Sequence, residues 1–326
     1  LIMKIKNIFP FAASALLLAS CGIYNKYERP EVNAQGLIRD VQSDTDTLAV
    51  ADTTSFGNLP WRQVFTDPQL QSLIETALAH NTDYLNCALN VKMVEAQLTM
   101  AKLAFLPSVA FTPQGTISQW DGNKASKIYS LPVSASWTVD LFGNILNVKR
   151  STQMQLLGMK DYQLVVKTKL ITNVANMYYT LLMLDRQLEI LNSMSELTQD
   201  TWRIMKLQKE LGRANETSVQ SAEASHYGVL TNIADMKRQI REVENSLSLV
   251  LGQPAQTIAR GKLADQSLPT EFSTGVGIQL LANRPDVHYA EMALASCFYD
   301  TQQARSNFYP QLTISGTGAF TNNGGG

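Results

Sequence analysis

The stretch 286-DVHYAEMALASCFYDTQQARSNFYP-310 repeats the plan of 83-DYLNCALNVKMVEAQLTMAKLAFLP-107, at an offset of 203 residues and without a gap. The offset aligns Lys102 with Arg305, Phe105 with Phe308 and Pro107 with Pro310. Each copy begins with an Asp suited to a helix start and contains no Gly, and no Pro before its last residue. The shared plan predicts two copies of one helix-then-strand unit. The alternative is two unrelated helices with similar ends.

After each copy the period of the apolar residues changes from about 3.6 to 2. Odd positions are apolar over 109–117 and 129–141, and a polar loop, 121–127, lies between them. The second copy continues with apolar residues at every second position, namely Leu312, Ile314, Gly316, Gly318 and Phe320. Strands of about 10–13 residues suit a tilted crossing of a bilayer, with the hydroxyl-rich side facing water. The alternative is a hairpin of a soluble sandwich. In lipid such strands must close with strands of other chains.

The middle of the chain predicts long helices. No Pro occurs between Pro132 and Pro254, and Gly212 separates two apolar heptad patterns. The first pattern consists of Leu170, Val174, Met177, Leu181, Leu184, Leu188 and Leu191. The second consists of Ile233, Met236, Ile240, Val243, Leu247 and Val250. We expect helices over 143–211 and 216–251, and a shorter one that starts at Asp67 and Pro68. The expected fold is mainly α, a long coiled-coil-like helical barrel with membrane β-strands.

The N-terminus has the pattern of a secretory signal. Lys4 and Lys6 precede an apolar run, 8–19, which is too short to span a bilayer. The run ends in Leu18, Ala19, Ser20 and Cys21, which resembles the lipobox of bacterial lipoproteins. The resemblance implies an S-diacylglycerol and an N-palmitoyl group on Cys21, enough for stable anchoring. The alternative is a buried Cys in an ordinary signal peptide.

Motifs for catalysis or cofactor binding are absent from the sequence. The formal net charge of −1 suggests no nucleic-acid partner. There is no phosphate-binding loop, no H-E-x-x-H and no C-x-x-C, and the three His residues are scattered. We therefore expect no enzyme activity, no metal site and no cofactor other than the covalent lipid. Cys87 and Cys297 are expected to be two buried thiols.

Eight stretches follow one another along the chain: LASC, WRQVFTDPQLQSLIETAL, AKLAFLP, SASWTVDLFGN, LGRANETSVQSAEA, LGQP, LLANRPDVHYAE and ARSNFYPQLTISG. In this order they resemble the TolC-like outer membrane efflux proteins, in the lipoprotein (OprM/NodT-type) branch of RND efflux systems. The resemblance implies a homotrimer with a 12-stranded transmembrane β-barrel and a periplasmic helical tunnel, anchored in outer-membrane lipid. It implies two partners, a periplasmic adaptor (membrane fusion) protein and an inner-membrane RND-type pump. The expected function is passive conduction of drugs or other exported compounds. The alternative is a lipid-anchored periplasmic coiled-coil scaffold or adaptor.

The resemblance and the patterns together divide the chain. The expected parts are a signal peptide (1–20), a lipid-anchored tether (21–60), first-repeat helices (61–107), a transmembrane hairpin (108–141), long periplasmic helices (142–252), a connector (253–283), the second-repeat helix (284–310) and the start of an incomplete second hairpin (311–326). Members of the family continue beyond this point. We therefore expect the sequence to be a C-terminally truncated part of a longer reading frame.

Overall fold

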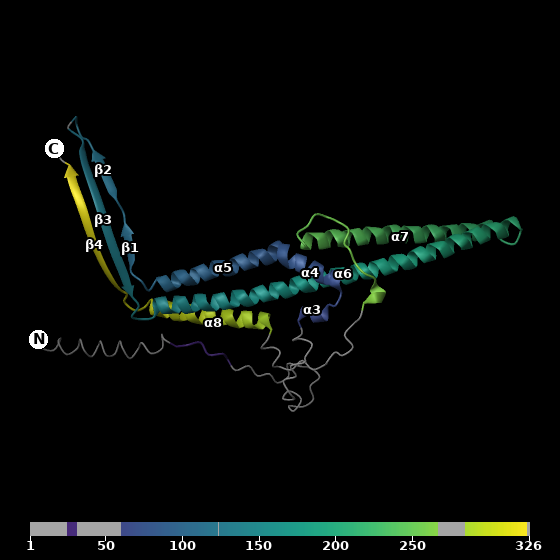
Figure 1. Cartoon of the computed structure of the whole chain (residues 1–326), viewed down its shortest axis with the longest axis horizontal. Helices are drawn as coiled ribbons and strands as arrows, with labels where there is room; N and C mark the ends of the chain where they lie inside the picture. The colour runs from purple at the N-terminus through teal and green to yellow at the C-terminus, as the bar shows by residue number, and fades with distance from the viewer. Residues whose placement is uncertain (1–24, 31–59, 123, 267–283, 325–326) are drawn as a thin grey trace, which may run out of the picture. The chain divides into compact units, whose positions relative to one another are not determined.

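A computed structural model describes residues 25–30, 60–122, 124–266 and 284–324 (Figure 1). The chain forms two units, and each is described separately. The first contains the described residues 25–30, 90–122, 124–162 and 284–324, and the second contains 60–89 and 163–266. The helices α5 (Thr82–Leu103) and α6 (Asn144–Glu210) contribute residues to both units.

The sheet of the first unit is antiparallel and is organised around β3 (Ser126–Val139). The strands β1 (Ser108–Phe111) and β2 (Gln114–Ser118) pair end to end with one edge of β3, and β4 (Leu312–Gly324) pairs with the other edge (Figure 1). The β3–β4 ladder runs from Lys127 opposite Gly324 to Val139 opposite Leu312. The strand of the second repeat therefore pairs along nearly the whole length of a strand of the first.

The sequence predicted one strand where the structure has β1 and β2, and two prolines explain the interruption. The register does not slip, because Phe111 lies opposite Val133 and Gln114 lies opposite Ser130. Between these pairs the backbone N–H of Thr112 donates to the carbonyl of Pro132, at 3.3 Å. Neither Pro132 nor Pro113 has an N–H with which to continue the ladder. Strand pairing is lost locally while the alternation of faces is kept.

The two repeated helices have matching bounds. The helix α8 runs over Pro285–Ser306, so each of its ends lies 203 residues beyond the corresponding end of α5. On the first part of α6, small and polar side chains meet α8: Ser151 Oγ lies 3.0 Å from Ser296 Oγ. A Cβ on Gly158 would lie 3.3 Å from Met292 Cβ. Close approach of α6 and α8 thus depends on small residues at their contact.

The second unit contains α3 (Trp61–Val64), α4 (Pro68–His80), α7 (Glu216–Val250) and a 3-10 turn, η3 (Leu263–Asp265), besides the rest of α6. Both heptad predictions are confirmed in the core, where Val174, Leu181 and Leu247 are fully buried. The buried face of α6 is wider than the heptad line, because Tyr178 and Leu182 are buried as well. Helix α4 adds Leu70, Ile74 and Ala77, which lie at helical spacing on one face, to the same core.

Local signals set the helix ends. The side chain of Asp67 accepts a hydrogen bond from the N–H of Gln69 and caps α4, which confirms the predicted start. The side chain of Asn215 caps α7 in the same way by accepting from the N–H of Ser218. Gly212 and Gly252 follow α6 and α7 with φ of 70° and 68°, the left-handed conformation that favours glycine after a helix.

Candidate functional site

The sheet has one face covered by hydroxyl side chains. The ladder registers place on this face the even positions of β1, β2 and β3 and the odd positions of β4. Its hydroxyl residues are Ser108, Thr116, Ser118, Ser126, Ser130, Ser134, Ser136, Thr138, Thr313, Ser315, Thr317 and Thr321. Gln114 adds an amide, Ala110, Ile128, Pro132 and Ala319 are the apolar exceptions, and no paired strand residue of this face is charged. We call it the hydroxyl face.

Hydroxyls of neighbouring strands meet across the hydroxyl face. Ser108 Oγ lies 3.1 Å from Ser136 Oγ, and Thr138 Oγ1 lies 3.3 Å from Thr313 Oγ1. A hydroxyl both donates and accepts, so these pairs are satisfied within the sheet and can also bind water. The face is therefore wettable along its length and carries no fixed charge.

The opposite face of the same sheet is exposed, and it is apolar apart from Lys127 and Asn322 near one end of the ladder. Opposed positions there bring together Leu131 and Phe320, and Trp137 and Ile314. Their exposed fractions lie between 42% and 71%. Contiguous exposed apolar surface on this scale indicates an interaction surface rather than a face left in water. The 14 residues of β3 and the 13 of β4 are more than a tilted membrane strand needs. We call it the apolar face.

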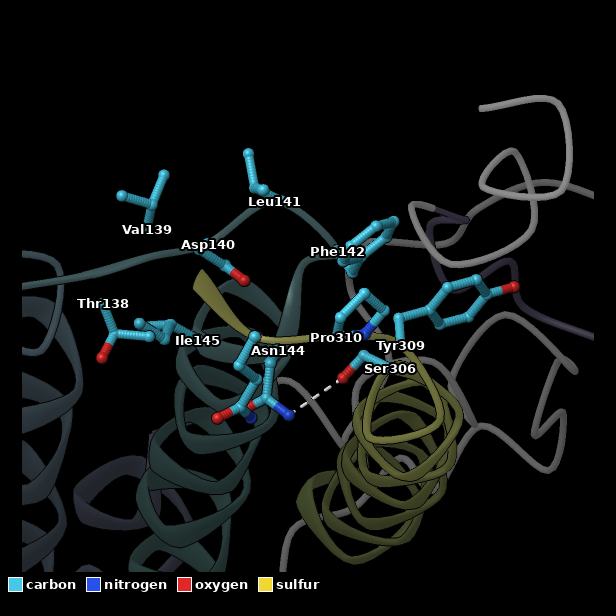
Figure 2. Close-up of a pocket in the computed structure, with 11 residues that line it drawn as sticks. Thr138, Val139, Asp140, Leu141, Phe142, Asn144, Ile145, Ser306, Tyr309 and Pro310 are labelled. Atoms are coloured by element: carbon cyan, nitrogen blue, oxygen red, sulfur yellow. Dashed lines mark hydrogen bonds between the residues drawn. The ribbon is translucent and has the colours of Figure 1, made fainter. Parts of the chain in front are cut away.

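A small cavity lies where the sheet joins the helices (Figure 2). It has a volume of about 30 Å³, room for about one or two water molecules. The side-chain amide of Asn144, at the start of α6, donates to Ser306 Oγ at the end of α8, at 3.0 Å. Phe142 stacks on Tyr309 at 4.8 Å between ring centroids. The turn from β3 into α6 is therefore joined to the end of α8 by ring packing and a hydrogen bond.

In the second unit, an ion cluster holds the first half of the predicted connector. The guanidinium of Arg260 donates two hydrogen bonds to Asp185 on α6 and one of 2.6 Å to Glu244 on α7. The side chains of Arg260 and Glu244 are 12% and 11% exposed. The hydrogen bonds to Asp185 raise the pKa of Arg260, against the effect of burial, and Glu244 raises it further. Sequence reasoning missed this cluster, because its members lie 75 and 16 residues apart and no local pattern links them.

A second polar cluster is centred on Asp67. Its carboxylate accepts from the hydroxyl of Tyr178 at 2.5 Å and from the side-chain amide of Gln266 at 2.8 Å. Burial alone would raise the pKa of Asp67, but the hydrogen bonds from Tyr178, Gln266 and the Gln69 N–H together lower it. Burial and the hydrogen bond to Asp67 raise the pKa of Tyr178 to about 12. The N–H of Gly261 donates to the same hydroxyl at 3.2 Å. The helix cap predicted from sequence therefore also fixes the connector.

The predicted site residues have different outcomes. Leu18, Ala19, Ser20 and Cys21 lie outside the described residues, so the lipid attachment stays a prediction. Cys87 is a buried free thiol, as expected. The expectation for Cys297 was wrong, because this thiol is exposed. The buried positions of α8 next to it are Ser296 and Tyr299, and Cys297 lies on the other side of the helix.

The residues that the structure describes contain neither a metal-binding cluster nor a membrane-spanning helix. Among residues 25–30, 60–122, 124–266 and 284–324, no group of three or more His, Cys, Asp or Glu side chains could hold a metal ion. Within those same ranges, no helix combines the length and the apolar character needed to cross a membrane.

Comparison with known proteins then identifies the family. The family model described as "Outer membrane efflux protein" matches residues 73–253, more than half of the chain. The chain belongs to the outer membrane efflux protein family. The match includes α5, the first hairpin, α6 and α7, and it confirms the family seen in the sequence.

Individual proteins that are similar to this efflux protein support the same family. It is 26% identical over 319 residues to the cation efflux system protein CusC of Escherichia coli, covering 95% of this chain and 67% of CusC. It is also 26% identical over 322 residues to the toluene efflux pump outer membrane protein TtgC of Pseudomonas putida, covering 95% of this chain and 66% of TtgC. The chain thus spans about two thirds of the length of these relatives.

The fold is that of solved outer-membrane channels. The structure of the outer-membrane channel OprN superposes with a TM-score of 0.76 at 22% identity, over 92% of this chain and 68% of OprN. The mainly helical fold with a small set of strands, expected from the sequence, is therefore confirmed. The protein is therefore an outer membrane efflux protein with the fold of these channels.

Proposed function

We propose that the protein is the channel of a tripartite efflux system, through which drugs or other exported compounds cross the outer membrane passively. The hydroxyl face of the sheet carries this proposal, because it offers water a neutral, hydrogen-bonding path along the full length of β3. The apolar face behind it fits the hydrocarbon of a bilayer. No bond is made or broken in such passage, so the proposed activity is not enzymatic.

The edges of the sheet support assembly into a homotrimer. In the described part of the chain, one edge of β1 and β2 and one edge of β4 have no strand partner. Each unpaired N–H or C=O in hydrocarbon costs several kcal/mol, so the sheet is stable there only when neighbouring strands complete it. A closed barrel of twelve strands, four from each of three full-length chains, satisfies every edge, and the described sheet supplies three of these four strand positions because β1 and β2 share one. This assembly is the one that the family resemblance implies.

The partners follow from passive transport. A neutral channel supplies no energy, so we infer an inner-membrane RND-type pump and a periplasmic adaptor that delivers the cargo. The relatives differ in cargo, since one is named for cations and the other for toluene. A face without fixed charge suits both classes, and selection of the cargo is then made by the pump. The periplasmic helices α6 and α7 are the part of the chain that adaptors contact in this proposal.

We also propose that Cys21 carries the lipid that anchors the N-terminus in the outer membrane. The proposal rests on the sequence LASC after an apolar run and a basic start. Acyl chains on one residue give stable anchoring only in combination, which is why a diacylglyceryl group and an N-acyl group are expected together. Palmitate labelling that survives Cys21→Ser would contradict this assignment.

The decisive experiment is the oligomeric mass of the full-length protein after detergent extraction from the outer-membrane fraction, followed by conductance in a planar bilayer. A trimer that forms stable water-filled pores is the expected result. A soluble protein, or a monomer without conductance, would overturn the proposal. The lipid-anchored scaffold or adaptor would then explain the helices better than a channel does.

A further inference from the structure

The described segment 25–30 lies against α8. The backbone N–H of Tyr27 donates to the hydroxyl of Tyr299 at 3.2 Å, and the Tyr27 ring meets Phe298 edge-on at 5.9 Å. Two residues later, Arg29 donates to both carboxylate oxygens of Glu291, with Nε at 2.6 Å from Oε1. A backbone hydrogen bond, a ring contact and a two-pronged ion pair therefore act within three residues of this segment.

The receiving residues on α8 are largely buried. The side chain of Glu291 is 17% exposed and Tyr299 is 7% exposed. The guanidinium carbon of Arg150, on α6, lies 5.7 Å from the centre of the Tyr299 ring. The hydrogen bond from Arg29 lowers the pKa of Glu291 against the effect of burial, so docking favours the ionised carboxylate. Exposed ion pairs contribute little on average, but two-pronged pairs with a mostly buried partner are stronger.

The direction of the segment and the short stretch of chain back to Cys21 limit where Cys21 can lie. The chain contacts Phe298 and Tyr299 first and Glu291 next, so from Tyr27 to Arg29 it runs toward the start of α8. From Tyr299 to Ser306 the helix rises about 10 Å. Six residue steps separate Cys21 from Tyr27 and extend at most about 20 Å in any conformation. The strand β4 is about 40 Å long, so Cys21 can reach its base but not its far end.

We propose that Tyr27 and Arg29 form a latch that docks the N-terminal segment on Tyr299 and Glu291 of α8 and confines Cys21 to the level where the helices join the sheet. That this level coincides with the membrane surface rests on the proposed function, whereas the contacts of the latch do not. Docked in this way, an acyl group on Cys21 enters the same leaflet that borders the base of the apolar face. An undocked tether would leave the anchor free to diffuse away from the sheet.

Limited trypsin digestion tests the latch directly, because the Lys26–Tyr27 bond carries the N–H that donates to Tyr299. Cleavage after Lys26 is followed by mass spectrometry in full-length, detergent-extracted protein, relative to cleavage after the exposed Lys124 in the hairpin loop. Loss of the charged hydrogen bonds in Glu291→Gln or Arg29→Met should speed cleavage after Lys26 about tenfold or more. The swap Arg29→Glu with Glu291→Arg should restore part of the protection.

Matched variants distinguish loss of the latch from a general loosening of α8 and from a loss of acylation at Cys21. Tyr299→Phe keeps the ring and removes one acceptor, so it should speed cleavage, whereas Tyr289→Phe on the same helix should not. Protection should persist in Cys21→Ser, so a failure of acylation leaves the result readable. The latch is overturned if wild type and Glu291→Gln are cleaved after Lys26 at the same rate relative to Lys124.

The confinement of Cys21 has its own measurement. Spin labels at Gly22→Cys and Gln311→Cys, in a background of Cys21→Ser, Cys87→Ala and Cys297→Ser, report the distance between the N-terminal segment and the base of β4 by pulsed electron resonance. We expect a narrow short-range distribution that broadens in the added variant Glu291→Gln. An equally broad distribution in both proteins would overturn confinement.

Discussion

The hydroxyl of Tyr178 donates a 2.5 Å hydrogen bond to the carboxylate of Asp67, which lies 111 residues earlier in the chain and caps α4. The same hydroxyl accepts from the N–H of Gly261 in the connector. One side chain of α6 thus fixes both the start of α4 and the chain that follows α7. The free energy of unfolding of the second unit should depend on this atom.

Tyr178→Phe should destabilise the protein by about 1–3 kcal/mol, because it removes a donor to a half-buried carboxylate and an acceptor from a backbone N–H. Urea unfolding followed by helical circular dichroism measures the change. Tyr179→Phe is the matched control, since its hydroxyl makes no hydrogen bond to any residue that the structure describes. Equal stability of the two variants would show that the Tyr178 hydroxyl contributes nothing.

The hydroxyl of Tyr178 should lose its proton at a higher pH than an ordinary tyrosine does. Burial and Asp67 favour the neutral phenol and raise the pKa of Tyr178 to about 12, whereas an unfolded tyrosine titrates near 10. The stabilisation from this group is therefore complete below about pH 10 and is lost as the pH rises toward 12. Burial also raises the pKa of Tyr179 and of Tyr27, so absorbance at 295 nm should show several late components among the 11 tyrosines, and the latest of them should be absent from Tyr178→Phe. A variant that instead loses amplitude near pH 10 would contradict the assignment.

Replacing a buried arginine should lower the free energy of unfolding far more than replacing an exposed one. Arg260 pairs with Asp185 and Glu244 at 12% exposure, and Arg238 pairs with Asp235 and Glu242 on the surface of α7. Arg260→Met leaves the buried carboxylate of Glu244 without its partner, which typically lowers the free energy of unfolding by about 3–5 kcal/mol. We expect a value near the lower end of this range, because the other partner, Asp185, is partly exposed. Arg238→Met should change stability little, since water screens its pairs. The comparison uses urea midpoints, and equal shifts in the two variants would refute it.

The contrast between these residues explains how much of the fold the sequence predicts. The helices and strands were predicted because their signals are local, such as the heptads of α6 and α7, the Asp67 cap and the alternation in β3. The cluster around Arg260 was not predicted, because Arg260 lies in the connector and its acidic partners lie on two separate helices, α6 and α7. Cys297 was misassigned because a nearly uniform α8 sequence does not reveal which side contacts α6. The interruption between β1 and β2 was visible only when the register showed that Pro132 lies across from Thr112, next to Pro113.

Two glycines with the same backbone conformation should respond differently to alanine. Gly252 and Gly212 both have φ near 70°, which costs an L-residue roughly 1–2 kcal/mol. A Cβ on Gly252 would also lie 2.8 Å from the carbonyl oxygen of His80, whereas a Cβ on Gly212 would meet nothing within 4 Å. Gly252→Ala should therefore lower the melting temperature more than Gly212→Ala. Equal melting temperatures would mean that the end of α4 yields without cost.

Two neighbouring residues of β3 separate the two faces of the sheet most cleanly. Val133 lies on the apolar face opposite Phe111 and Gly318, and Ser134 lies on the hydroxyl face opposite Ala110 and Thr317. A charge at mid-bilayer on a lipid-facing strand position costs about 2–4 kcal/mol, so Val133→Arg should reduce the amount of trimer in the outer membrane. Ser134→Arg should assemble normally, because its side chain points to water.

Substitutions at Ser134 on the hydroxyl face should also change which ions pass through the pore. With no charge on the hydroxyl face, the wild-type sheet should favour neither cations nor anions, and Ser134→Arg should shift the reversal potential in a salt gradient toward anion selectivity. Ser134→Asp should shift it toward cations, with assembly unchanged. If Ser134→Arg blocks assembly as strongly as Val133→Arg, the two faces do not differ in environment, and the assignment of one to lipid and the other to water is wrong.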